Sequence, residues 1–141
     1  MKRRVIAVLA CCVALSGCDP LFGVAHVAEL VQPPPTDCVR QVLASTPGLE
    51  FPDQRDPPNV FSYWVVPENG ERFLGVLQLQ KQESGSYRYR NGNLQIGLPP
   101  PQAEINAVRP VLRAIDSGLS ERCGLTEPIK EICYRVDCKP F

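Results

Sequence analysis

The sequence predicts a small α+β domain: a four-stranded antiparallel meander packed by two helices, with a C-terminal edge strand and disulfide staples. Three observations carry this prediction. Alternating apolar residues and turn signals fill positions 60–98, helical apolar spacing occurs on either side of them, and four of the seven cysteines lie beyond position 35. The 141 residues match one ordinary domain, and the 44% of apolar residues suffice for a packed core.

Three turn signals divide positions 60–98 into the four predicted strands. Asn69-Gly70 and Asn91-Gly92 are typical of two-residue hairpin turns, because both positions require positive φ. Glu83-Ser84-Gly85 suits a three-residue turn with Gly85 left-handed. The turns therefore predict both the strand boundaries and the pairing register.

The predicted register pairs Val66 with Phe73 in the first hairpin and Tyr89 with Leu94 in the last, and it places Leu79 opposite Tyr89. A shift of one residue would move every side chain to the other face. In this register one face collects the apolar residues Trp64, Val66, Phe73, Leu77, Leu79, Tyr87, Tyr89, Leu94, Ile96 and Leu98.

The opposite face of the predicted first hairpin is apolar as well. Apolar side chains on a second face need a cover, either from this chain or from a partner. These residues form a candidate partner patch, while the last two strands present a solvated surface of Arg88, Arg90 and Gln95. The candidate patch comprises Phe61, Tyr63, Val65, Leu74 and Val76.

Helices are predicted before and after the meander. The first is capped by Thr36 or Asp37 and runs to about Thr46, and the second covers about 102–123 and ends at Gly124. Pro110 predicts a kink or two abutting helices, because it removes one backbone hydrogen bond. Alternation over 129–137 predicts the edge strand. The apolar helix positions are Val39, Val42 and Leu43, then Ile105, Val108, Leu112, Ile115 and Leu119.

The N-terminus has the pattern of an export signal. A basic start precedes eleven uncharged residues, Val5 to Leu15, which are too few to span a membrane. Leu15-Ser16-Gly17-Cys18 resembles the lipobox of bacterial lipoproteins. The resemblance implies cleavage after Gly17, with diacylglycerol and an N-linked acyl chain such as palmitate on Cys18. It also implies a bacterial membrane anchor facing the periplasm, and Asp19 slightly favours the inner membrane over the outer.

The predicted organisation is a signal peptide at 1–17, a lipidated tether at 18–35 and the α+β domain at 36–141. Residues 21–31 are apolar enough for a short helix on the membrane or against the domain. His26, the single histidine, lies among them without an identifiable partner, so we interpret it as an incidental tether residue.

Cleavage would remove Lys2, Arg3 and Arg4, which leaves 12 basic against 15 acidic side chains. Cys11 and Cys12 leave with the signal and Cys18 carries the lipid, so four cysteines remain for the domain: Cys38, Cys123, Cys133 and Cys138. An even number of cysteines in an exported domain predicts two disulfides. If each element reverses direction, Cys38 meets Cys123 and leaves Cys133 with Cys138. Four cysteines allow three pairings, and the sequence alone does not choose among them.

The residue types favour binding over catalysis. With no histidine in the body and oxidised thiols, a Ser–His or Cys–His site cannot be assembled there. The cysteines lack the paired close spacing of zinc sites, and the sequence has no glycine-rich phosphate-binding loop. Equal numbers of basic and acidic residues argue against a nucleic-acid-binding protein. We therefore expect no metal and no cofactor beyond the lipid, and a partner that is an envelope protein, a glycan such as peptidoglycan, or an enzyme to be inhibited.

Two alternatives to a binding module remain open. One is a small glycan hydrolase that uses loop carboxylates, and Glu50, Asp53 and Asp56 share one loop. The other is a purely structural spacer of the envelope.

Overall fold

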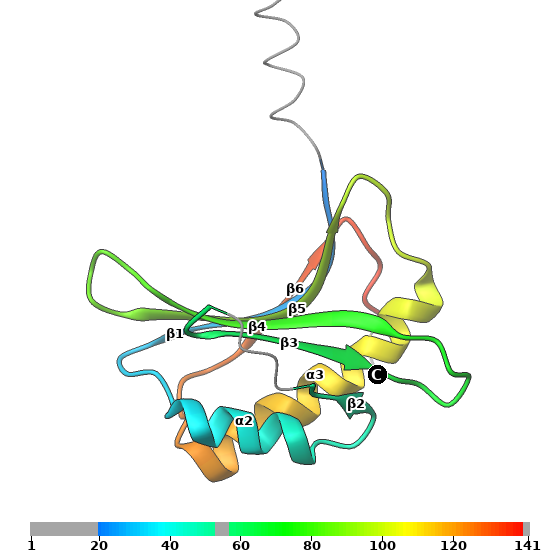
Figure 1. Ribbon diagram of the computed structural model, residues 1–141. Helices are drawn as coiled ribbons and strands as arrows, with labels where there is room; N and C mark the ends of the chain where they lie inside the picture. The colour runs from blue at the N-terminus through cyan, green and yellow to red at the C-terminus, as the bar shows by residue number, and fades with distance from the viewer. Residues whose placement is uncertain (1–19, 53–56, 140–141) are drawn as a thin grey trace, which may run out of the picture.

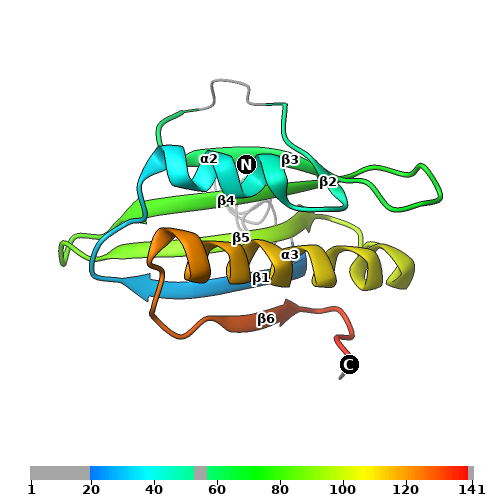
Figure 2. The same cartoon turned by 90° about the horizontal axis from the view of Figure 1, so that it is seen from below.

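The computed structural model describes residues 20–52 and 57–139 as an α+β fold. Six antiparallel strands form one sheet in the order β2-β3-β4-β5-β1-β6, and both helices lie on the same face of it (Figures 1 and 2). The α+β class, the two helices and the edge strand are confirmed, although the sheet has more strands than predicted. The elements are β1 Leu21–Leu30, α2 Thr36–Ser45, β2 Leu49–Glu50, β3 Val60–Val65, β4 Phe73–Lys81, β5 Tyr87–Ile96, α3 Gln102–Cys123 and β6 Lys130–Tyr134.

The first strand is the largest departure from the sequence prediction. Residues 21–30, expected to be a helix within a tether, form β1 between β5 and β6. Val24, Ala28 and Leu30 are buried beneath the helices, which is the period-two pattern of a half-covered strand. The tether prediction for this segment is therefore wrong, and the fold begins only three residues after Cys18.

The last predicted hairpin is also wrong, because β5 continues straight through Asn91-Gly92. The partner of β5 is instead β1, with Ala25 opposite Gly92. A Cβ on Gly92 would lie 2.7 Å from the carbonyl oxygen of Val24 and 2.9 Å from the Cβ of Ala25. This glycine therefore permits a close approach of two strands rather than a turn.

The first hairpin is present with a register one residue away from the prediction. Val65, rather than Val66, pairs with Phe73, because residues 66–72 form a longer loop than a two-residue turn. Trp64 consequently faces away from the helices, where it lies beneath the guanidinium of Arg72 at 5.3 Å. The middle turn agrees with the prediction.

The candidate partner patch is divided between the two faces by this register. Phe61, Tyr63 and Val65 are buried under the helices. Leu74, which is 48% exposed, and Val76 lie on the opposite side. The five residues therefore do not form one surface, and this chain's own helices cover three of them.

Both helices match their predicted ranges closely, and their apolar positions are all buried. Gly124 ends α3 with a left-handed φ of 73°, and Pro110 lies inside one continuous helix. The helices run antiparallel, which brings Cys38 at the start of α2 to Cys123 at the end of α3, and these two form a disulfide. Cys133 and Cys138 form the second disulfide. These two pairs are those that the predicted topology favoured.

Two further findings bear on where such a chain resides. Within residues 20–52 and 57–139, no helix is long and apolar enough to cross a membrane. Disulfides persist in oxidising compartments. The two cysteine pairs are therefore compatible with an exported protein.

Candidate functional site

The two faces of the sheet differ in cover. Both helices pack on one face, and no described helix or strand lies over the other (Figure 1). We call this other side the open face. Its side chains on the three strands β5, β1 and β6 include Val27, Arg88, Arg90, Lys130, Ile132 and Tyr134.

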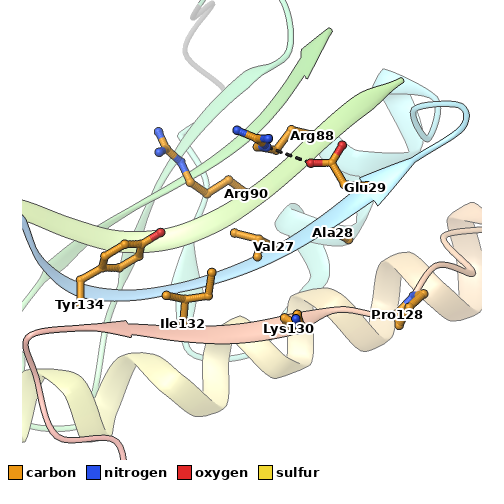
Figure 3. A pocket seen from close by; sticks show the side chains of 9 residues that line it. All are labelled: Val27, Ala28, Glu29, Arg88, Arg90, Pro128, Lys130, Ile132 and Tyr134. Carbon is orange, nitrogen blue, oxygen red and sulfur yellow. Dashed lines mark hydrogen bonds and ion pairs between the residues drawn. The ribbon is translucent and has the colours of Figure 1, made fainter. Parts of the chain in front are cut away.

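A cavity of about 510 Å³ lies on the open face across β5, β1 and β6 (Figure 3). Register explains its lining, because Val27 stands directly opposite Arg90 on one side and Lys130 on the other. Ile132 and Tyr134 continue the apolar floor. The cavity thus combines an apolar floor with positively charged sides.

The charges of this cavity are not balanced within the described residues. Arg88 Nε donates to Glu29 Oε1 at 3.0 Å, and this is the cavity's ion pair. Arg90 Nη2 donates to the neutral Gln78 Oε1 at 2.7 Å. Neither Arg90 nor Lys130 pairs with a carboxylate among residues 20–52 and 57–139. The open face therefore keeps positive charge in a chain that is neutral overall.

Two neighbouring cavities extend the same surface over β4. One of about 200 Å³ is lined by Leu74, Val76 and Leu94. Another of about 490 Å³ lies towards Asn59 and the far end of β4. Arg90 lines all three cavities, so its guanidinium stands at the centre of the hollow surface.

A charge cluster of His26, Arg109, Asp116 and Glu131 lies beneath the sheet, on the helix side. His26 Nδ1 hydrogen-bonds Asp116 Oδ2, and its Nε2 lies 2.9 Å from Glu131 Oε2. Arg109 donates two hydrogen bonds to the carboxylate of Glu131, from Nη2 to Oε1 at 2.6 Å and from Nε to Oε2 at 3.2 Å. Tyr89 donates its hydroxyl to Asp116 Oδ1 at 2.5 Å. The cluster joins β1, β5, β6 and α3.

The cluster favours a charged imidazole. Burial by itself lowers the pKa of His26, but the hydrogen bonds and charges of Asp116 and Glu131 outweigh it and raise the pKa above 6.5. Hydrogen bonds from Arg109 lower the pKa of Glu131 to about 2, against the smaller opposing effect of burial. Burial, reinforced by the charge of Asp116, raises the pKa of Tyr89 well above 10.

The geometry of the cluster gives it a supporting role in the fold. Both imidazole nitrogens of His26 already face carboxylates, so neither is free to take a proton from a nucleophile. His26 in β1 stands opposite Glu131 in β6, next to Val27 and Lys130 on the open face. By tying these strands to α3, the cluster holds the floor of the cavity in place.

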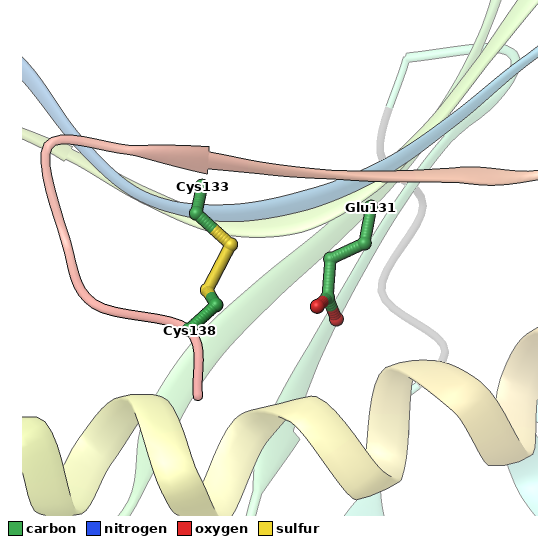
Figure 4. A group of neighbouring side chains, drawn as sticks. All are labelled: Glu131, Cys133 and Cys138. Atoms are coloured by element: carbon green, nitrogen blue, oxygen red, sulfur yellow. A yellow bond between two sulfur atoms is a disulfide. The ribbon is translucent and has the colours of Figure 1, made fainter. Parts of the chain in front are cut away.

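Glu131 also lies beside a disulfide, as Figure 4 shows. Its carboxylate and the sulfurs of Cys133 and Cys138 are within 4.8 Å of one another. The two sulfurs are bonded to each other, so they offer no thiolate to a metal ion. This group is part of the same support for β6.

Of the predicted lipidation site and the three loop carboxylates, only one residue lies within the described part of the chain. Cys18 and two of the three loop carboxylates, Asp53 and Asp56, lie outside the described residues. The third, Glu50 of β2, forms an ion pair with Arg72, which directly precedes β4.

Sequence reasoning missed the charge cluster, although a signal was present. Asp116 and Arg109 occupy core-facing positions of α3, next to the apolar stripe, and both are buried. Charged residues there require partners. His26 belongs to the alternating pattern of β1, which identifies it as an inward-facing residue once that segment is a strand.

Comparisons of the chain with protein-family models, with curated proteins and with solved structures found no match. The open face therefore has to be judged by its own chemistry and geometry. That surface combines an apolar floor, a half-open shape and positive side chains that have no carboxylate partner among the described residues.

Proposed function

We propose that the chain is an exported, lipid-anchored envelope protein that binds an acidic segment of a partner protein on its open face. The observation that carries the binding proposal is Arg90, which lines all three cavities and has no carboxylate partner among the described residues. A carboxylate from a partner would supply the missing counter-charge at that point.

The shape of the open face favours a protein partner. Three adjoining hollows form a broad, half-open surface rather than one enclosed cavity for a small molecule. Arginine and tyrosine are enriched at protein interfaces, and Arg90 and Tyr134 stand here over the apolar floor of Val27 and Ile132. Apolar contact would supply affinity, and the cations would select an acidic partner.

The anchoring part of the proposal rests on the lipobox resemblance at residues 15–18. Two disulfides support residence outside the cytoplasm. We expect the precursor to accumulate in its native bacterium when signal peptidase II is inhibited. Normal processing under the inhibitor would contradict the lipid anchor.

The binding proposal is tested by photocrosslinking in intact cells of the native bacterium. A photoreactive phenylalanine replaces Gln80, which is exposed on the open face beside Arg88. In the matched control the same group replaces Ala114, an exposed residue of α3. We expect a discrete protein adduct from position 80 and none from position 114.

Charge reversals decide whether the adduct depends on the proposed chemistry. Arg90→Glu should remove the adduct at position 80. Arg113→Glu, an equal charge change at an exposed residue of α3, should leave it. An adduct that survives Arg90→Glu, or one that arises equally from position 114, would contradict binding through the open face.

A further inference from the structure

Two of the most exposed large apolar side chains lie together at one end of the fold. Ile96 ends β5 at 69% exposure, and Leu98 follows it at 77%. Residues 94–103 contain no charged side chain. This end of the molecule, which we call the ribbon tip, comprises Pro20, Leu21 and Ile96–Leu98.

The ribbon tip projects because β5 leaves β4 before it ends. Pairing with β4 stops at Gly92, whereas pairing with β1 continues to Leu21 opposite Ile96. The side-chain amide of Asn93 donates a hydrogen bond to the carbonyl of Leu74 at 2.8 Å. This bond links β5 to β4 just beyond their last backbone pair. In Figure 1 the start of β1 and the end of β5 rise together out of the plane of the other strands.

The covalent chain places the predicted anchor beside this tip. Leu21 is three positions after Cys18, and an extended chain spans at most about 11 Å over that distance. Ile96 is the direct cross-strand neighbour of Leu21, about 5 Å away between Cα atoms. The backbone N–H of Gly97 donates to the carbonyl of Pro20 at 3.2 Å, which fixes the following turn against the same strand.

We propose that Ile96 and Leu98 insert into the surface of the bilayer that holds the acyl chains of Cys18. The inference rests on the lipid anchor proposed above, because the short connection leaves these side chains within reach of that bilayer. An uncharged tip with two large apolar residues can enter the headgroup region without burying a charge. A lipid surface is therefore the partner that this edge fits.

The insertion would orient the whole domain. β1 runs away from the bilayer and β5 runs back towards it, and Val27 lies about 20 Å along β1 from Leu21. The cavity around Arg90 would then stand clear of the lipid, where a partner protein can reach it. Val31, 79% exposed just after the other end of β1, would lie far from the membrane.

The test uses the full, acylated chain in vesicles of phosphatidylethanolamine and phosphatidylglycerol with or without brominated acyl chains. Trp64→Phe removes the native tryptophan, and one tryptophan is introduced by Leu98→Trp or, as the matched control, by Val31→Trp. Both positions are exposed, so each variant should keep the fold and its two disulfides. Intact mass and flotation with the vesicles report the lipid anchor separately.

We expect brominated lipid to lower the emission of the Leu98→Trp protein at least about twofold, since the tip would lie at the acyl boundary. The Val31→Trp protein should show no change. An acylated protein that floats with vesicles but shows no quenching at position 98, or equal quenching at both positions, would overturn insertion and leave the anchor standing. A purified chain without acyl groups would overturn both.

Discussion

The two faces of the sheet handle charge in opposite ways. On the helix side, His26 and Arg109 are buried against Asp116 and Glu131, and every member of this cluster has a partner of opposite charge. On the open face, Arg90 reaches only a neutral amide. Charges fixed in pairs build a scaffold, whereas a charge without a counter-charge is available to a partner.

This contrast assigns different roles to neighbouring residues of one strand. In β1, His26 points towards α3 and Val27 towards the cavity. Changes on the helix side should therefore affect stability first, and changes on the open face should affect binding first.

The disulfide that joins the two helices should contribute most to stability. Replacing Cys38 and Cys123 together with serine opens a connection between residues 85 positions apart. The chain-entropy model gives a loss of about 4 to 5 kcal/mol in the free energy of unfolding, which urea titration measures. Replacing Cys133 and Cys138, only 5 positions apart, should cost about 2 kcal/mol. Equal losses would contradict the entropic account.

Breaking the charge cluster should come next. Asp116→Ala leaves the His26 imidazole and the Tyr89 hydroxyl without their shared acceptor. We expect a loss of about 3 to 5 kcal/mol in the free energy of unfolding. Glu121→Ala, at an exposed position of the same helix, should change it by less than about 0.5 kcal/mol. Similar values for the two variants would show that the cluster is not a support.

Stability should also depend on pH through this cluster. The pKa of His26 is raised by folding, so its contribution is complete below pH 6.5 and is lost as the pH rises through the folded value. The pKa of Glu131 is lowered to about 2, so its contribution is complete above about 4.5 and is lost as the pH falls towards 2.

Unfolding in urea across this range measures the dependence. We expect maximal stability between about pH 4.5 and 6.5. His26→Gln should flatten the decline on the alkaline side. A wild-type protein that gains stability as the pH rises from 6.5 would contradict a charged His26.

The smallest effect on stability should come from the open face. Arg90→Glu exchanges the charge of an exposed side chain, and we expect a change of less than about 0.5 kcal/mol in the free energy of unfolding. Urea titration of this variant beside wild type checks the expectation. A large loss from Arg90→Glu would mean that Arg90 belongs to the scaffold.

The parts of the fold that the sequence predicts well are local. The apolar spacing of α3 and its terminal Gly124 depend on neighbours within a few residues, so range and cap agree with the structure. The middle turn at Gly85 is equally local, and its φ is 87°. The disulfide pairs agree because the two predicted helices run in opposite directions.

The parts that the sequence did not predict depend on distant partners. Asn91-Gly92 is a strong turn signal, but β1, more than sixty positions earlier, offers pairing along the whole of β5. Non-local pairing therefore overrides the local preference. The cluster was missed for the same reason, since His26 meets Asp116 and Glu131 only in the folded chain. Arg90 was predicted to be on the surface, but only the tertiary structure reveals its position among the three cavities.

The affinity of the full chain for the protein crosslinked at position 80 tests the central claim most directly. Measured with wild type, Arg90→Glu and Arg113→Glu, it separates the open face from the rest of the surface. We predict that Arg90→Glu weakens binding at least about tenfold, which corresponds to about 1.4 kcal/mol, while Arg113→Glu leaves it unchanged. Equal affinities for all three proteins would contradict a binding site centred on Arg90.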